Sequence, residues 1–243
     1  MKKFLTAVLV LLSVATFAQR DSSINSLFKK ANSIFNAKKG NANGLSGNDI
    51  VSGLKEALSL GTEKSTGRLS ATDGFFKDAA VKILMPPEVS KVQNKLKMLG
   101  MGGLVDNAVL SMNRAAEDAS KSAAPIFLKA IKSMSVPDAL SILKGTDTAA
   151  TNYLRRSTLD QLTAAFTPII SASLQKVDAT KYWNDVFTTY NKFSFNKVDT
   201  DINSYVTNKA LNGIFYYVAQ EEKNIRKDPS ARASDILKKV FGK

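Results

Sequence analysis

The chain has 243 residues, 44% hydrophobic and 23% charged, with 34 lysines and arginines against 21 aspartates and glutamates. This composition is typical of a globular protein that buries a core, and it excludes a long disordered chain. The chain contains no cysteine and no histidine, so disulfides, thiolate metal sites, a cysteine-linked lipid anchor, and most hydrolytic triads and zinc sites are excluded. The net charge of +13 favours anionic partners over cationic ones.

The first 18 residues have the pattern of a secretory signal peptide. Lys2 and Lys3 give a basic start, residues 4–14 form an apolar run, and Ala18 completes a small-residue cleavage site. The run is shorter than the about 20 residues that a membrane-spanning helix needs. We therefore expect cleavage after Ala18, a net charge of +11 on the mature chain, no transmembrane span, and a periplasmic or secreted protein. For such a protein, we expect the partner to be another protein or an anionic envelope surface rather than nucleic acid.

Residues 19–47 are expected to form an amphipathic helix followed by a Gly- and Asn-rich linker. Apolar residues recur at helical spacing within residues 22–38, and the lysines fall off that stripe. Glycine and asparagine are frequent in residues 40–48, which is typical of a flexible connection. The helix either docks on its own domain or lies on a membrane surface, and the sequence leaves both alternatives open.

Residues 48–243 are expected to form a mainly α, single multi-helix domain. Asp73 and Gly74 predict a break after the first helix, Pro168 predicts a kink, and residues 201–226 are apolar over most of the helix circumference, as in a buried helix. The expected helices span residues 48–69, 87–99, 104–121, 124–134, 135–144, 148–156, 159–174, 179–190, 201–226 and 236–241.

One small two-stranded hairpin is the only β structure that the sequence allows. Val81, Ile83 and Met85 alternate with other residues before two prolines, and Phe193 and Phe195 form the only comparable segment.

Four residues are candidates for a binding site. Arg114 and Glu117 lie three residues apart on one helix, a spacing that also suits an ordinary solvated ion pair. Arg155, with Arg156 and Lys144, is a candidate anion site, although adjacent arginines on a helix point in different directions. Neither a catalytic residue nor a metal site is indicated, and no cofactor is expected.

Glu221 is the fourth candidate. At 100° per residue it falls on the apolar side of its helix, so we expect a buried or half-buried carboxylate held by a basic residue of another helix, with Arg114 or Arg155 as the first candidates. Glu222 is expected nearer the helix edge, paired with Arg226 at i, i+4. The alternative for Glu221 is that the helix end frays into solvent.

Several blocks of the sequence are similar to a bacterial exported family known only as domain of unknown function 4197 (DUF4197). The blocks are GLKEAL (53–58), DGFF (73–76), LSMNRAAE (110–117), VTNKAL (206–211) and DPSAR (228–232), with FG at 241–242. The resemblance covers about residues 48–242. It implies a helical exported domain and brings no activity and no site residues with it.

Three classes of function fit these observations. An interaction or scaffold module of the cell envelope is the first hypothesis, because the chain is helical, basic and without histidine or cysteine. A carrier of a small apolar or anionic ligand is the second, since helical domains rich in Phe and Met can enclose a pocket. An enzyme that works without histidine and cysteine is the third, and the sequence favours a non-enzymatic role.

Overall fold

The computed structural model describes residues 47–87, 102–176 and 201–228, with scattered single positions between and after these ranges. These residues belong to the compact unit Leu45–Lys243. The expected signal peptide and amphipathic helix lie outside the described residues, as do most of the helices expected at 87–99, 179–190 and 236–241. Within the three ranges no helix is long and apolar enough to span a membrane.

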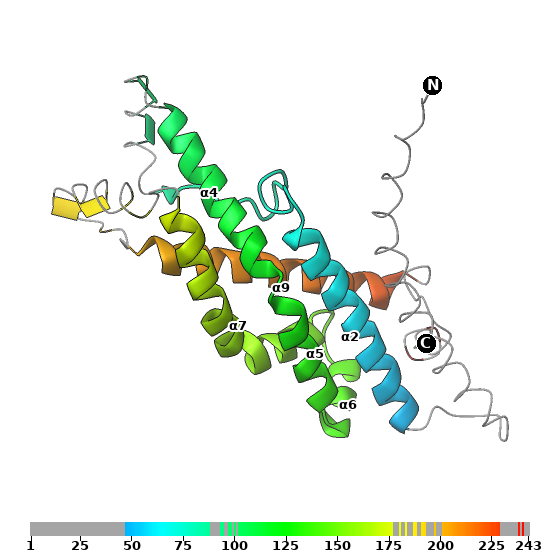
Figure 1. Ribbon diagram of the computed structural model, residues 1–243. Coiled ribbons are helices and arrows are strands. Elements are labelled where there is room, and N and C mark those ends of the chain that lie inside the picture. Colours follow the sequence, from blue (N-terminus) through cyan, green and yellow to red (C-terminus); the bar gives the residue numbers. More distant parts are fainter. Residues whose placement is uncertain are drawn as a thin grey trace, which may run out of the picture. The chain divides into compact units, whose positions relative to one another are not determined.

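The described ranges contain six helices and no strand, so the mainly α fold is confirmed (Figure 1). The helices are α2 (Gly47–Ser70), α4 (Gly102–Ser120), α5 (Ala123–Ser133), α6 (Val136–Lys144), α7 (Ala149–Gln175) and α9 (Ile202–Lys227).

Local sequence signals explain two of the helix starts. Ser135 caps α6 in a capping box, in which its hydroxyl accepts the Asp138 amide and the Asp138 carboxylate accepts the Ser135 amide. Asp201 caps α9 through the amides of Asn203 and Ser204. Both helices therefore begin within a residue of the expected positions.

Helix α7 is one continuous helix, whereas the sequence was expected to give two, with a break near residues 156–159. Leu154, Thr158 and Leu162 are buried at intervals of four residues, so one apolar face continues through the expected break. The Thr158 hydroxyl also bonds back to the Leu154 carbonyl at 2.6 Å, which satisfies this polar group inside the helix.

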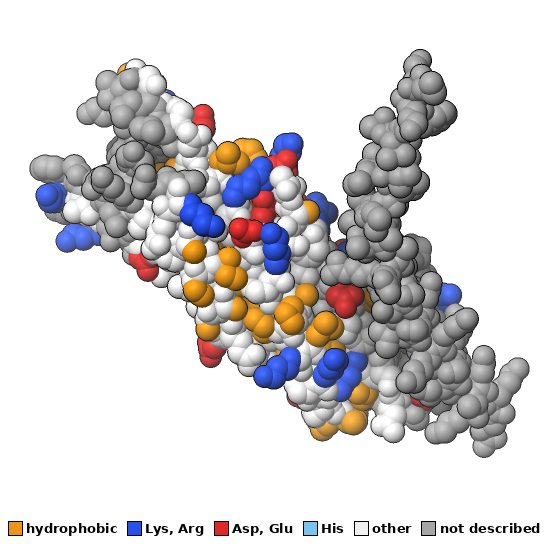
Figure 2. All heavy atoms as spheres, viewed as in Figure 1, with side chains coloured by type: hydrophobic (Ala, Val, Ile, Leu, Met, Phe, Trp, Pro, Cys, Tyr) orange, Lys and Arg blue, Asp and Glu red, His pale blue; other side chains and the backbone are white. Residues whose placement is uncertain are grey.

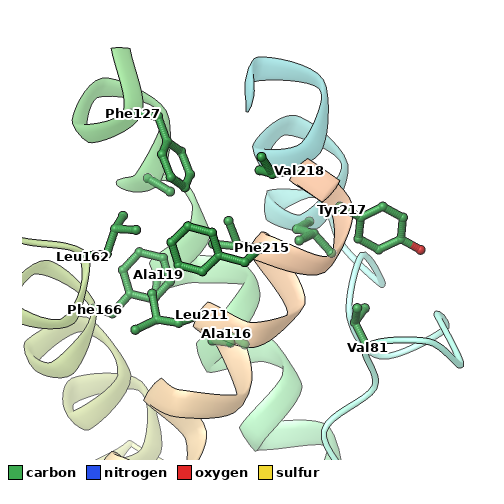
Figure 3. Packing of buried hydrophobic residues seen from close by; sticks show 14 of the residues in the cluster. Val81, Ala116, Ala119, Phe127, Leu162, Phe166, Leu211, Phe215, Tyr217 and Val218 are labelled. Carbon is green, nitrogen blue, oxygen red and sulfur yellow. The ribbon is translucent and has the colours of Figure 1, made fainter. Parts of the chain in front are cut away.

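The core lies between α9 and the helices α2, α4 and α7, all of which contact α9. Phe215 of α9 meets Phe127 of α5 edge to face, with 5.7 Å between ring centroids. Figure 3 shows Phe215 on the same side of α9 as Leu162 and Phe166, whereas Tyr217 points away from them. Several side chains on the fully buried face of α4 are small, among them Ala115, Ala116 and Ala119. Their size permits α4 to approach its neighbours closely.

The segment around Val81, Ile83 and Met85 is not a strand. The buried side chain of Asn113 on α4 accepts the Ile83 amide at 2.8 Å and donates to the Ile83 carbonyl at 2.8 Å. Asn113 thus supplies the two hydrogen bonds that a neighbouring strand would make. The proposed partner segment, with Phe193 and Phe195, lies outside the described residues.

Gly213 lies where the segment after α2 packs closely against α9. A Cβ atom at this position would lie 2.7 Å from Phe75 Cε1 and 3.3 Å from Val81 Cβ. We expect Gly213→Ala to lower the free energy of unfolding by about 1–3 kcal/mol, because the Phe75 ring is fully buried and overpacking exceeds the gain in helix propensity. Urea unfolding followed by circular dichroism measures the effect.

Gly67→Ala is the matched control, since Gly67 is an exposed glycine of α2 with no atom within 4 Å of the added Cβ. It should stabilise the chain by about 0.5–1 kcal/mol. Stabilisation by both substitutions would contradict the tight packing at Gly213.

Candidate functional site

A cluster of charged side chains holds the segment that follows α2. Asp73 has a φ of 69° in the left-handed region, and Gly74 is packed so closely that an added Cβ would lie 2.4 Å from the Arg68 carbonyl oxygen. The backbone amides of Phe75 and Phe76 then point at α4, where Glu117 Oε1 accepts them at 3.1 and 3.2 Å. Glu117 is 4% exposed, so its carboxylate is a buried anchor for this turn.

Arg114 completes this cluster. Its guanidinium donates to Glu117 Oε2 at 2.6 Å and to Asp73 Oδ1 at 2.6 Å. The expected pair of Arg114 and Glu117 is present, but it is not a solvated surface pair, because Glu117 lies under the turn. Figure 2 shows acidic and basic side chains gathered beside α4 near the end of α2. Lys77 and Arg114 hold the pKa of the Asp73 carboxyl below its usual range.

A hollow of about 380 Å³ lies on the solvent side of the same turn. Arg68, Asp73, Lys77 and Asp78 supply its charged lining. Each cation already has a carboxylate partner, because Arg68 pairs with Asp78 and Lys77 with Asp73, both at 2.8 Å. A small anion bound in this hollow would therefore have to compete with two carboxylates.

Tyr217 of α9 joins the hollow to the core. Its hydroxyl donates to Asp78, and the Arg68 guanidinium lies 4.3 Å above its ring. Burial raises the pKa of Asp78, but hydrogen bonds from Tyr217, the Ala80 amide and Arg68 outweigh it and leave the pKa lowered. Burial and the bond to Asp78 raise the pKa of Tyr217 from 10 to about 12.

The raised pKa of Tyr217 predicts a loss of stability in alkali. A group whose pKa is raised on folding contributes stability below its unfolded pKa, about 10 for tyrosine, and loses it as the pH rises through the folded value. We expect the melting temperature to fall between pH 10 and pH 12, and Tyr217→Phe to make that decline shallower. Tyr216→Phe, which removes the adjacent exposed tyrosine, is the control. Identical pH profiles for Tyr217→Phe and the unmodified chain would contradict this account.

A second buried carboxylate, Glu222 of α9, joins α6 to α7. It accepts the amides of Ala150 and Thr151 at 3.0 and 2.8 Å, at the start of α7. Arg226 donates to Glu222 at 2.9 Å and to the Ile142 carbonyl of α6 at 2.9 Å. Glu222 thus caps α7, whose own N-cap residue, Thr148, makes no side-chain cap bond.

Glu221 was expected to be more buried than Glu222, and the structure shows the reverse. Glu221 keeps 16% of its side-chain surface and pairs with Lys64 of α2 at 2.8 Å, so the expected half-buried carboxylate with a basic partner from another helix is confirmed, but the partner is neither Arg114 nor Arg155. Glu222 is the more buried residue, and its expected pairing with Arg226 is confirmed. Helix periodicity places both residues relative to α9, but the first turn of α7 contacts Glu222, and only the tertiary structure brings α7 there.

Arg155 lies on α7 beside α9. Its guanidinium is 4.3 Å from the centroid of the Phe215 ring, and it donates to Asn212 Oδ1 at 3.3 Å. The structure thus separates the four candidate residues. Arg114 and Glu117 lie in one cluster, Glu221 pairs with Lys64 of α2, and Arg155 lies where α7 contacts α9.

Sequence reasoning did not assign a role to Asn113 or identify Glu222 as buried, although signals for both exist. Asn113 is polar and lies between the apolar positions Val109, Met112 and Ala116, which indicates a buried side chain with a specific partner. The start of α7 lacks an effective cap of its own, which indicates a cap supplied by another helix.

The geometry favours structural use of the buried carboxylates. Glu117 and Glu222 each accept bonds from backbone amides and a guanidinium, so their lone pairs are engaged. No cluster of three or more metal-ligating side chains occurs among the described residues. These features define the described part as a helical domain whose internal charges tie turns to helices.

The family model described as "Protein of unknown function (DUF4197)" matches residues 44–242 of the chain. The protein therefore belongs to the DUF4197 family, in agreement with the resemblance seen in its sequence. No curated protein and no solved structure matches the chain.

Proposed function

We propose that this protein is an exported interaction module that binds another protein of the cell envelope. The observation that supports this proposal is a division of charge. The buried carboxylates of Glu117 and Glu222 accept hydrogen bonds from groups inside the domain. In contrast, several surface cations form no ion pair with a described carboxylate. These cations include Lys129, Lys132, Arg155, Arg156, Lys209 and Lys223.

A rigid helical surface with an excess of exposed cations is better suited to binding another molecule than to catalysing a reaction. Buried ion networks fix the turns, so the surface keeps one shape and loses little entropy on binding. Unpaired cations attract an anionic partner over a distance of about 10 Å at ordinary salt. The signal-peptide pattern of residues 1–18 supports placing this partner outside the cytoplasm.

The second candidate function is transport of a small anionic ligand. The hollow lined by Arg68 and Lys77 favours it, because both cations reach solvent there. Their existing pairs with Asp78 and Asp73 weigh against it. An enzyme that uses neither histidine nor cysteine is the third candidate.

One experiment separates the candidates. The tagged chain is cross-linked in intact cells of its own source, purified from the envelope, and measured by native and proteolytic mass spectrometry. We expect a mature chain that begins at Gln19 and a protein recovered in near-stoichiometric amount. A chain with residues 1–18 retained would contradict export, and a bound small molecule without any partner protein would favour the carrier.

A further inference from the structure

One surface combines unpaired cations with an exposed aromatic ring, and we call it the α7–α9 face. At 100° per residue, Lys209, Asn212, Tyr216 and Lys223 share one side of α9. Helix α7 runs antiparallel to α9, because Glu222 contacts the start of α7 and Asn212 contacts Arg155 further along. The face consists of Arg155, Leu159, Lys209, Asn212, Tyr216 and Lys223.

Arg155 is held ready to bind a carboxylate. Its guanidinium is stacked on Phe215 at 4.3 Å and bonded to Asn212, and these two contacts fix the plane of the group. Among the described residues Arg155 has no acidic partner. A fixed guanidinium plane with free N–H groups matches the two oxygens of a carboxylate.

Tyr216 lies one helical turn along α9 from Asn212, the residue that Arg155 contacts, and its ring is also held in place. The residue is 43% exposed, and its ring meets the Tyr217 ring edge to face, with 5.3 Å between centroids. Tyr217 in turn is held by Asp78 and Arg68. Exposed tyrosine and arginine side chains held in one conformation are the residues that contribute most to protein interfaces.

We propose that the α7–α9 face binds an acidic segment of a partner protein, with a carboxylate on Arg155 and an apolar or aromatic side chain against Tyr216 and Leu159. This inference rests on the proposed interaction function and names the chemistry of the partner. Charge complementarity carries it, because Arg155, Lys209 and Lys223 give the face three unpaired cations. The chain's own residues 22–39 contain four lysines and no acidic residue, so they lack the carboxylates that this face would bind.

A membrane surface fits this face less well than a protein segment. Helices that lie on membranes insert a row of large apolar side chains. The α7–α9 face offers Tyr216 and the 37%-exposed Leu159 among amide and cationic groups. These side chains are better suited to binding a carboxylate at Arg155 than to inserting a row of apolar side chains into a membrane.

Fluorescence anisotropy with the full-length mature chain tests the proposal. The probe is a short fluorescein-labelled peptide rich in glutamate with one tyrosine, and its control is the same peptide with glutamine in place of glutamate. Arg155→Gln removes the charge, Arg155→Lys keeps the charge but loses the planar fork, and Tyr216→Ala removes the ring. Lys129→Gln, which removes an exposed and unpaired cation of α5, is the matched control.

We expect the glutamate peptide to bind and the glutamine peptide to bind at least about tenfold more weakly. Arg155→Gln, Arg155→Lys and Tyr216→Ala should each weaken binding about fivefold or more, and Lys129→Gln less than about twofold. Thermal melts establish that each variant is folded. Failure of the glutamate peptide to bind, equal losses in Lys129→Gln and Arg155→Gln, or tighter binding to phosphatidylglycerol vesicles would each overturn the proposal.

Failure of this inference is distinguishable from failure of the proposed function. A partner protein that is still cross-linked by the Arg155→Gln chain in cells would leave the interaction function intact and place its surface elsewhere. Loss of that protein in Arg155→Gln but not in Lys129→Gln would support the α7–α9 face.

Discussion

Replacing Glu222 by glutamine is expected to lower the free energy of unfolding by about 3–5 kcal/mol, the largest effect that we predict for this chain. The substitution leaves the size of the side chain unchanged and removes its charge. Arg226, whose side chain is 11% exposed, would then lose its ion pair with Glu222, and the α7 amides of Ala150 and Thr151 would face a neutral group. Equilibrium unfolding in urea measures the loss.

Glu221→Gln is the matched control for this prediction. Glu221 is adjacent in sequence, carries the same charge, and pairs with a lysine whose side chain is 70% exposed. Removing such a pair costs at most about 1 kcal/mol. Similar losses in the two variants would show that Glu222 does not hold α6 and α7 together.

Replacing Glu117 by glutamine is expected to lower the free energy of unfolding by about 2–3 kcal/mol. A hydrogen bond to a charged group contributes about 1.5–3 kcal/mol, and Glu117 receives bonds from Arg114 and from the amides of Phe75 and Phe76. The damage should begin locally, in the turn after α2. Hydrogen exchange should therefore become faster at the Phe75 and Phe76 amides, and urea unfolding measures the total loss.

The next residue along the chain provides the control. Asp118 pairs with Lys121 at the surface, and both side chains are more than half exposed. Asp118→Asn should change the free energy of unfolding by no more than about 0.5 kcal/mol and leave exchange in the turn after α2 unaltered. If Glu117→Gln leaves that exchange unchanged as well, the turn is held by Asn113 and by packing instead.

The helices were predictable from the sequence because their signals are local. Ser135 with Asp138 begins α6, Asp201 begins α9, and the period of apolar residues gives the extent of α2, α4 and α5 within a few residues. The one described helix that was divided wrongly, α7, contains Thr158 where a break was expected. Its hydroxyl can cap a helix or bond back within one, and only burial against neighbouring helices decides between these roles.

The candidate residues show where local reasoning ends. Arg114 and Glu117 were found because they lie on one helix at a spacing that allows a pair, but their bonds to Asp73, Phe75 and Phe76 span about forty residues of sequence. Arg155 was found as a cation, while its stacking on Phe215 depends on how α7 packs against α9. The spacing of apolar residues along α9 does not indicate which helix packs against each of its faces.

The sequence by itself therefore determined the helical class of the described domain, the family, and the ends of most described helices, because apolar period and capping residues act over a few positions. The tertiary structure alone decided that Glu222 is the buried carboxylate, that Asn113 replaces a partner strand, and that Arg155 and Tyr216 share one face. The reason is physical: the cost of burying a charge or a polar group depends on the donors that the rest of the chain brings to it, and those donors come from distant helices.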